Sequence, residues 1–200
     1  FETLAVHAGV EPDPLTGAVM TPIYQTSTFA QSDVGVHKGY DYARSGNPTR
    51  TALQNALATL EGGRFGLSFS SGMAAIDTLL RLVQPGEHVL VGNDVYGGTY
   101  RLFTKVLAGY GIDFDFIEMS DLAVVESAFR PKTRLVWLET PTNPLLKLFD
   151  IAAMADMAHA NGAQFAVDNT FASPALQQPL QLGADFVVHS TTKYIGGHSD

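Results

Sequence analysis

The stretch ADFVVHSTTKYIGGH, residues 184–198, decides the fold. Its apolar run, Phe186 to Val188, predicts a short buried strand that ends in hydroxyl side chains, a lysine and two glycines. In an open α/β sheet, the carboxyl ends of the strands face the ligand crevice. We therefore expect the strand to deliver Lys193 to a site, with the hydroxyls of Ser190 and Thr192 beside it and able to hold a phosphate. An isolated lysine after a strand is more often a solvated surface residue, so the rest of the chain must supply the context.

Composition argues against several classes of protein. The chain has 200 residues, of which 46% are hydrophobic and 16% charged, with no cysteine and a formal net charge of −8. The charged fraction lies below the roughly 25% usual for soluble domains, which indicates extensive buried surface, including subunit contacts. No long basic run suggests nucleic-acid binding, and no apolar run approaches the roughly eighteen residues of a membrane span. We therefore expect a cytoplasmic protein without disulfides or thiolate catalysis.

Residues 1–45 are predicted to form an extended arm. They hold several prolines and glycines and show no sustained helical or alternating period. A disordered tail is the alternative, but Ile23, Tyr24, Phe29 and Tyr40 make the segment more apolar than typical disorder. We expect the arm to contact a neighbouring subunit.

The pattern changes at Asn47 and Pro48, which predict the start of a helix that ends at Gly62. Beyond it, short apolar runs alternate with helical patterns. The expected strands are 66–71, 89–91, 114–117, 135–138, 165–167 and 186–188, and the expected helices between them are 72–80, 100–107, 122–129 and 151–160. This alternation is typical of an α/β fold whose mainly parallel sheet is covered by helices. We assign residues 46–200 to this large domain and expect it to be incomplete, because no helix follows to cover the last strand.

Polar side chains follow four of the predicted strands. Tyr96, Asn143, Asp168 and Lys193 each lie at or just after a strand end. Taken singly, the tyrosine suits a core or rim position, the asparagine a turn, and the aspartate a cap or turn. Repetition of the same placement predicts that an aromatic ring, an amide, a carboxylate and an amine converge on one crevice.

Together these groups match the needs of pyridoxal phosphate. The amine can form a Schiff base with the aldehyde, and the carboxylate can keep the pyridine nitrogen protonated so that the ring acts as an electron sink. The aromatic ring can stack on the cofactor, while hydroxyls and helix-end amides take the phosphate. The Ser-Ser-Gly turn at residues 70–72 suits such a cradle, although tight packing without a ligand would explain it equally. No dinucleotide-binding fingerprint or P-loop is present, and no metal is expected.

Five segments carry a resemblance to a known family: residues 42–49, 94–98, 139–144, 167–170 and 189–198. Through them, and over nearly the whole chain, the sequence resembles the Cys/Met-metabolism, or trans-sulfuration, family of pyridoxal-phosphate-dependent enzymes. That family includes cystathionine γ-synthase, cystathionine γ-lyase, cystathionine β-lyase and methionine γ-lyase. The resemblance implies the aspartate-aminotransferase-like fold type I, and a homotetramer of two tight dimers with active sites completed at the dimer interface.

The resemblance also implies roles for individual residues. Lys193 resembles the lysine that forms the Schiff base, Asp168 the partner of the pyridine nitrogen, and Tyr96 the residue that stacks on the ring and assists proton transfer. The remaining implied cofactor contacts are Gly72, Met73, Ser190 and Thr192 at the phosphate, Asn143 and Thr170 near the ring and its hydroxyl, and Tyr42 and Arg44 reaching the phosphate of the neighbouring subunit.

The choice among family members depends on two positions. Arg101 occupies a place where synthases and γ-lyases of the family have an arginine that can meet the distal polar end of a long substrate, beside Tyr96 and Asn143. An exposed helical arginine is the plain alternative. Gly98 departs from the methionine γ-lyase pattern, which has a cysteine there.

We therefore expect a cystathionine γ-lyase that cleaves L-cystathionine at the γ-carbon to cysteine, 2-oxobutanoate and ammonia. The alternative is a cystathionine γ-synthase, which joins cysteine to an O-activated homoserine; methionine γ-lyase and cystathionine β-lyase are less favoured. The arginine that the family uses for the substrate α-carboxylate lies in a C-terminal domain outside this sequence. A catalytically inert fragment, or a binding protein that uses the fold as an interaction surface, is the non-enzyme alternative.

Overall fold

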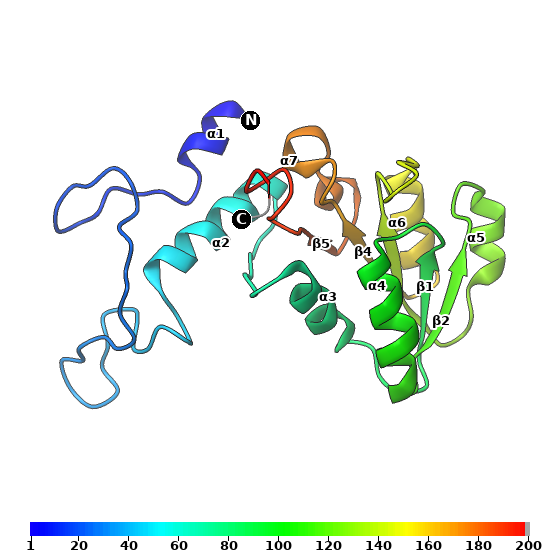
Figure 1. Ribbon diagram of the computed structural model, residues 1–200, viewed down its shortest axis with the longest axis horizontal. Coiled ribbons are helices and arrows are strands. Elements are labelled where there is room, and N and C mark those ends of the chain that lie inside the picture. The colour runs from blue at the N-terminus through cyan, green and yellow to red at the C-terminus, as the bar shows by residue number, and fades with distance from the viewer. Residues whose placement is uncertain (199–200) are drawn as a thin grey trace. The chain divides into compact units, whose positions relative to one another are not determined.

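The computed structural model describes residues 1–198, and the chain divides into two compact units, residues 1–68 and the remainder from Phe69 (Figure 1). The first unit contains helices α1 (Glu2–His7) and α2 (Pro48–Glu61). The Asn47 side chain caps α2 by accepting a hydrogen bond from the backbone N–H of Thr49 at 2.9 Å, and Gly62 ends the helix in the left-handed conformation. The structure thus confirms the predicted helix and both of its end signals.

The segment between α1 and α2 is irregular and is held by local polar contacts. Asp13 is its main anchor, because its carboxylate accepts hydrogen bonds from the Thr16 hydroxyl at 2.9 Å and from the Tyr24 hydroxyl at 3.1 Å. Several large apolar side chains of this segment are exposed, including Leu15 and Ile23. Helix α1 was not predicted, since its six residues are too few to show a helical period. Contact of the arm with a neighbouring subunit stays a prediction.

Within residues 69–198, five parallel strands form one sheet in the order β2-β1-β3-β4-β5. Their bounds are β1 (His88–Gly92), β2 (Asp113–Ile117), β3 (Thr133–Glu139), β4 (Gln164–Asp168) and β5 (Phe186–Val188). These confirm the five predicted strands from residue 89 onward. The carboxyl ends of all five lie at the same edge of the sheet, because all of its pairs are parallel.

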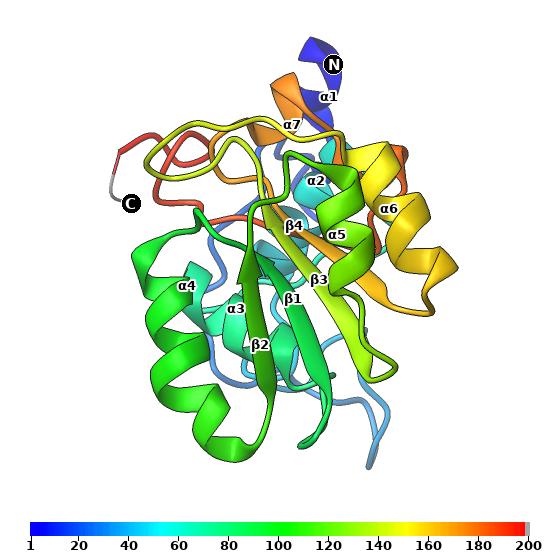
Figure 2. The same cartoon turned by 90° about the vertical axis from the view of Figure 1, so that its right-hand side faces the viewer.

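Helices cover both faces of this sheet, as Figure 2 shows. On one side lie α3 (Gly72–Leu80) and α4 (Gly97–Arg101), the latter continuing as a π-helical turn at Leu102–Val106 and a 3₁₀ turn at Leu107–Tyr110. On the other side lie α5 (Leu122–Ala128) and α6 (Ile151–Ala160), and the short helix α7 (Ser173–Leu176) and a 3₁₀ turn at Pro179–Leu182 precede β5. No helix among residues 1–198 is long and apolar enough to cross a membrane.

Alternate residues of β1, β3 and β4 supply two cores. In β3, Trp137 belongs to the core that contains Phe103 and Leu80, whereas Leu138 belongs to the core that contains Met154 and Phe165. Such two-sided burial explains why the strands read as continuous apolar runs in the sequence.

The strand predicted at residues 66–71 is wrong. This segment is irregular and pairs with no strand in the described part of the chain. Its apolar residues gave the signal of a buried strand, but Leu67 is 76% exposed and Phe69 is 41% exposed. An apolar run cannot by itself show whether a partner strand is available.

Truncation of Leu90 tests the interior position of β1, between β2 and β3. Leu90 is fully buried, so Leu90→Ala should lower the free energy of unfolding by about 2–5 kcal/mol. Leu82→Ala is the matched control, because Leu82 is 56% exposed and its truncation should change stability by less than about 0.5 kcal/mol. Urea titration of the whole protein measures both, and equal losses would contradict the assignment of β1 to the sheet interior.

Candidate active site

The order in which the chain adds strands to the sheet reverses between β1 and β3. The chain runs from β1 outward to β2 and then crosses to β3 on the other side of β1, and the carboxyl ends of strands at such a point form a crevice. A cavity of about 240 Å³ lies at this edge. The predicted site residues that line it are Gly72, Met73, Tyr96, Asn143, Asp168, Thr170, Ser190, Thr192 and Lys193. The structure therefore brings together the ends of β1, β3, β4 and β5, as the sequence predicted.

Asp168 ends β4 and is buried at the floor of this cavity. Thr170 fixes its carboxylate, since the Thr170 hydroxyl donates to Asp168 Oδ1 at 2.5 Å and the Thr170 backbone N–H donates to the same atom at 3.1 Å. Burial raises the pKa of Asp168 above its ordinary value, and the hydrogen bonds from Thr170, followed by His189, oppose that rise. A buried carboxylate is most stable beside a cation, and a protonated ring nitrogen of a ligand would supply one.

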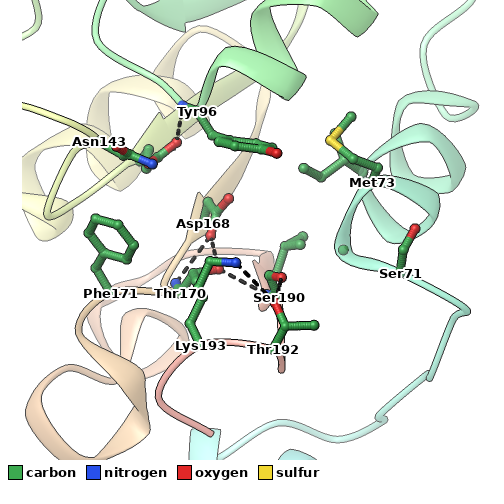
Figure 3. A pocket seen from close by; sticks show the side chains of 14 residues that line it. Ser71, Met73, Tyr96, Asn143, Asp168, Thr170, Phe171, Ser190, Thr192 and Lys193 are labelled. Atoms are coloured by element: carbon green, nitrogen blue, oxygen red, sulfur yellow. Dashed lines mark hydrogen bonds between the residues drawn. The ribbon is translucent and has the colours of Figure 1, made fainter. Parts of the chain in front are cut away.

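Thr170 also ties β4 to the segment after β5. Its hydroxyl oxygen accepts a hydrogen bond from the backbone N–H of Ser190 at 2.9 Å. Beyond that point, the hydroxyls of Ser190 and Thr192 lie 3.0 Å apart, and the Lys193 amine donates to Thr192 Oγ1 at 3.0 Å (Figure 3). One threonine hydroxyl thus connects the buried carboxylate to the segment that carries the lysine.

The beginning of α3 closes one side of the cavity. Ser71 caps the helix by accepting from the Ala74 backbone N–H at 3.1 Å. A Cβ atom added to Gly72 would lie 3.0 Å from Ser190 Cβ, so glycine is what allows the helix end to approach Ser190 this closely. Free N–H groups and the positive end of a helix beside two hydroxyls are the donors that a phosphate requires.

Tyr96 lies directly before α4, and its side chain is 44% exposed at the cavity. A Cβ atom added to Gly98 would lie 2.4 Å from Tyr96 Cε1 and 2.9 Å from Met73 Sδ. Gly98 therefore leaves the space that the tyrosine ring and the methionine occupy. In Figure 3 the Tyr96 ring and the Lys193 amine are drawn on opposite sides of Asp168.

Glu139 is a cavity residue that the sequence reasoning missed as a site residue. It ends β3, is 5% exposed, and accepts a hydrogen bond from the Tyr96 backbone N–H at 2.7 Å. Burial above all, and then the charge of Asp168, raises the pKa of Glu139 to about 8. Its position within the 139–144 segment, as a carboxylate that ends a buried strand, is the signal that could have identified it.

Of the site residues predicted from the sequence, three are not among the described residues that line this cavity. Tyr42 and Arg44 belong to the first unit, where the Arg44 guanidinium lies 4.7 Å from the centroid of the Tyr42 ring. Arg101 is exposed at the end of α4, and one of its guanidinium nitrogens lies 3.3 Å from where a Cβ of Gly97 would be. Contact of Tyr42 and Arg44 with a neighbour's phosphate, and of Arg101 with a substrate, stays a prediction.

The cavity fits pyridoxal phosphate in the chemistry of its donors. It presents an amine, a buried carboxylate, an aromatic ring, and a phosphate cradle built from a helix end and two hydroxyls. At the carboxyl ends of a parallel sheet covered by helices, this donor set defines a pyridoxal-phosphate-dependent enzyme domain of fold type I.

Comparison with known proteins gives the family. The profile described as "Cys/Met metabolism PLP-dependent enzyme" matches residues 2–200. The chain belongs to this family.

Curated relatives carry three different names. The chain is 59% identical over 200 residues to a probable cystathionine gamma-synthase of Herpetosiphon aurantiacus, covering 100% of this chain and 63% of that protein. It is 54% identical over 199 residues to a cystathionine gamma-lyase of Bacillus subtilis, and 52% identical over 201 residues to a cystathionine beta-lyase of Coxiella burnetii, covering 100% of this chain and 52% of each relative. The chain thus spans about half to three fifths of the length of these relatives.

Solved structures show the same fold. The cystathionine gamma-lyase of Lactobacillus plantarum, complexed with L-serine, superimposes with a TM-score of 0.96 at 51% identity, over 100% of this chain and 52% of that chain. The metB protein of Corynebacterium glutamicum also gives a TM-score of 0.96, at 52% identity, over 99% of this chain and 52% of that chain.

Replacement of Thr170 tests the connection between Asp168 and Ser190. Thr170→Val removes the hydroxyl that donates to one and accepts from the other, so we expect the affinity for pyridoxal phosphate to fall about tenfold. Thr170→Ser, which keeps the hydroxyl, should bind nearly as the wild type does. Fluorescence titration measures these affinities, and equal binding by the valine and serine variants would contradict the connection.

The same variant has a predictable pH dependence. Loss of the Thr170 hydroxyl removes a hydrogen bond that lowers the pKa of Asp168, so the pKa in the folded state should rise further above its ordinary value of 3.8. The folded valine variant then binds this proton more tightly than the wild type does. The loss of stability of the variant relative to the wild type should therefore be largest at pH values above the pKa of Asp168 in the folded variant. It should shrink as the pH falls toward 3.8, the ordinary pKa of an aspartate.

Proposed function

We propose that the protein is a trans-sulfuration enzyme acting at the γ-carbon of its substrate, and that it is a cystathionine γ-synthase, which joins cysteine to an O-activated homoserine. The observation that carries an enzymatic role is the convergence of Lys193, Asp168 and Tyr96 on one cavity. The choice of synthase is supported by the higher identity to the Herpetosiphon relative, 59% against 54% for the Bacillus lyase.

Cystathionine γ-lyase, the activity expected from the sequence, is the second candidate. It is supported by the 54% identity to the Bacillus subtilis relative and the 51% identity to the Lactobacillus plantarum structure, which both carry that name. Both activities begin with loss of a proton from the substrate Cα and departure of the γ-substituent, and they differ in whether a thiol then adds.

The residues of the cavity divide the chemistry among them. Pyridoxal phosphate, when bound, supplies an electron sink for negative charge that develops at the substrate Cα. Lys193 is the anchor for the aldehyde and, as a free amine, the base that takes the Cα proton. Asp168 holds the proton on the ring nitrogen, which its burial favours because an uncompensated buried carboxylate is costly. Ser190, Thr192 and the first N–H groups of α3 hold the phosphate.

Tyr96 has a separate role at the open side of the cavity. Its ring is partly exposed beside Met73, where a substrate would enter. We assign to its ring the stacking contact with the cofactor and to its hydroxyl a proton transfer near the leaving group. Asn143 and Arg101 are proposed as further substrate contacts, with Arg101 meeting the distal polar end.

Lys193→Ala tests the central assignment. Turnover should fall by about a thousandfold or more, because both the anchor and the base are lost, and the visible absorbance of the bound cofactor should change. Lys105→Ala, in the π-helical turn after α4, is the control and should retain wild-type turnover. Normal turnover and absorbance in the Lys193 variant would contradict the assignment, and a wild-type protein that binds no cofactor would favour the interaction-protein alternative.

Two assays of the whole protein separate the candidate activities. A synthase should form cystathionine from cysteine and an O-activated homoserine, whereas a lyase should release cysteine, 2-oxobutanoate and ammonia from cystathionine alone. Arg101→Ala should raise KM for the longer substrate, which is cystathionine for a lyase and the O-activated homoserine for a synthase, more than KM for short thiol amino acids. Equal increases would contradict a contact at the distal end of the substrate.

The proposed homotetramer has active sites completed by Tyr42 and Arg44 of a neighbouring subunit. Lys193→Ala and Arg44→Ala subunits should then each be nearly inactive alone. Mixed and reassembled in equal amounts, they should recover about a quarter of the wild-type activity, because half of the dimers are mixed and each of these has one intact site. Absence of recovery in reassembled mixtures would contradict a shared site.

A further inference from the structure

Where the strand order reverses, the loop after β1 and the segment at the end of β3 each use a carboxylate to hydrogen-bond to the other. From the end of β3, Glu139 accepts a hydrogen bond from the backbone N–H of Tyr96, in the loop after β1. From that loop, Asp94 accepts in return from the Thr142 hydroxyl and from the Leu145 backbone N–H at 3.1 Å, both in the loop after β3. Each loop therefore supplies the acceptor that holds the other.

Glu139 has the more direct connection to the cavity. Its carboxylate accepts the hydrogen bond from the Tyr96 backbone N–H at 2.7 Å, and Glu139 itself lines the cavity. Tyr96 and Asn143 are the residues that the loops after β1 and β3 contribute to the cavity lining. We propose that Glu139 is a positioning residue, whose carboxyl group holds the backbone of Tyr96 and so fixes its side chain at the cavity, and that it does so as a neutral carboxyl group at neutral pH. This proposal deepens the proposed function and rests on it.

The surroundings of Glu139 favour the neutral form. It is paired in register with Asp168 of β4, and Asp94 approaches from the loop after β1, so ionisation would place a third carboxylate at one buried edge of the sheet. The Lys193 amine lines the same cavity but donates to Thr192. Burial is the largest influence and raises the pKa of Glu139 to about 8, against the opposing hydrogen bond from the Tyr96 backbone N–H.

Substitutions of Glu139 distinguish its role as a hydrogen-bond acceptor from its protonation state. Glu139→Gln keeps an oxygen acceptor for the Tyr96 N–H but cannot titrate, whereas Glu139→Ala removes the acceptor. Glu139→Met removes the acceptor while keeping the volume, and it replaces the alanine variant if that variant does not fold. Glu126→Gln, on the exposed side of α5, is the matched control.

The experiment measures amide hydrogen exchange and carboxyl infrared absorption in the whole protein with its cofactor. We expect exchange at the Tyr96 amide to accelerate about tenfold or more in the alanine or methionine variant and to stay near the wild-type rate in the glutamine variant. The wild type should show a protonated-carboxyl band that disappears as the pH rises through about 8, and Glu139→Gln should lack it while Glu126→Gln retains it.

Unchanged exchange at Tyr96 in the variants without an acceptor would overturn the positioning role. A band that persists in Glu139→Gln, or that is absent from the wild type at neutral pH, would overturn the neutral state. Neither readout requires turnover, so a protein that shows both effects but converts no trans-sulfuration substrate would refute the proposed function and leave the positioning role intact.

Discussion

The hydrogen bonds of the Thr170 hydroxyl are the interaction on which the site depends. They join Asp168, at the end of β4, to the backbone of Ser190, just after β5. Together with the Thr170 backbone N–H, the hydroxyl satisfies the buried carboxylate of Asp168, and leaving such a group without donors is among the costliest changes in a protein interior. The same hydroxyl fixes the segment that carries Lys193, so the carboxylate and the amine are set relative to each other by one side chain.

The parallel sheet makes such short connections possible. Parallel pairing brings every strand end to the same edge, and the strand order reverses between β1 and β3, where the edge opens into a crevice. Loops from four strands then lie close enough to exchange hydrogen bonds. Two glycines allow the final approach, since Gly72 lets α3 reach Ser190 and Gly98 leaves room for the Tyr96 ring.

Much of this arrangement could be predicted from the sequence. The strands are buried on both faces and read as apolar runs, and the polar residues at their ends mark the crevice. The prediction failed at residues 66–71, because an apolar run does not reveal whether another strand can pair with it. Glu139 was missed for a related reason: its importance comes from its hydrogen bond to Tyr96, 43 positions away in the chain, which only the folded structure brings within 2.7 Å.

The central claim is that Lys193 is the residue that anchors pyridoxal phosphate. Reduction of the cofactor-loaded protein with borohydride, followed by proteolysis and mass spectrometry, tests it most directly, since reduction makes the link between amine and cofactor permanent. We predict a phosphopyridoxyl group on the peptide that contains Lys193. A modification found instead on Lys38, Lys105, Lys132 or Lys147, or on none of the lysines, would contradict the claim.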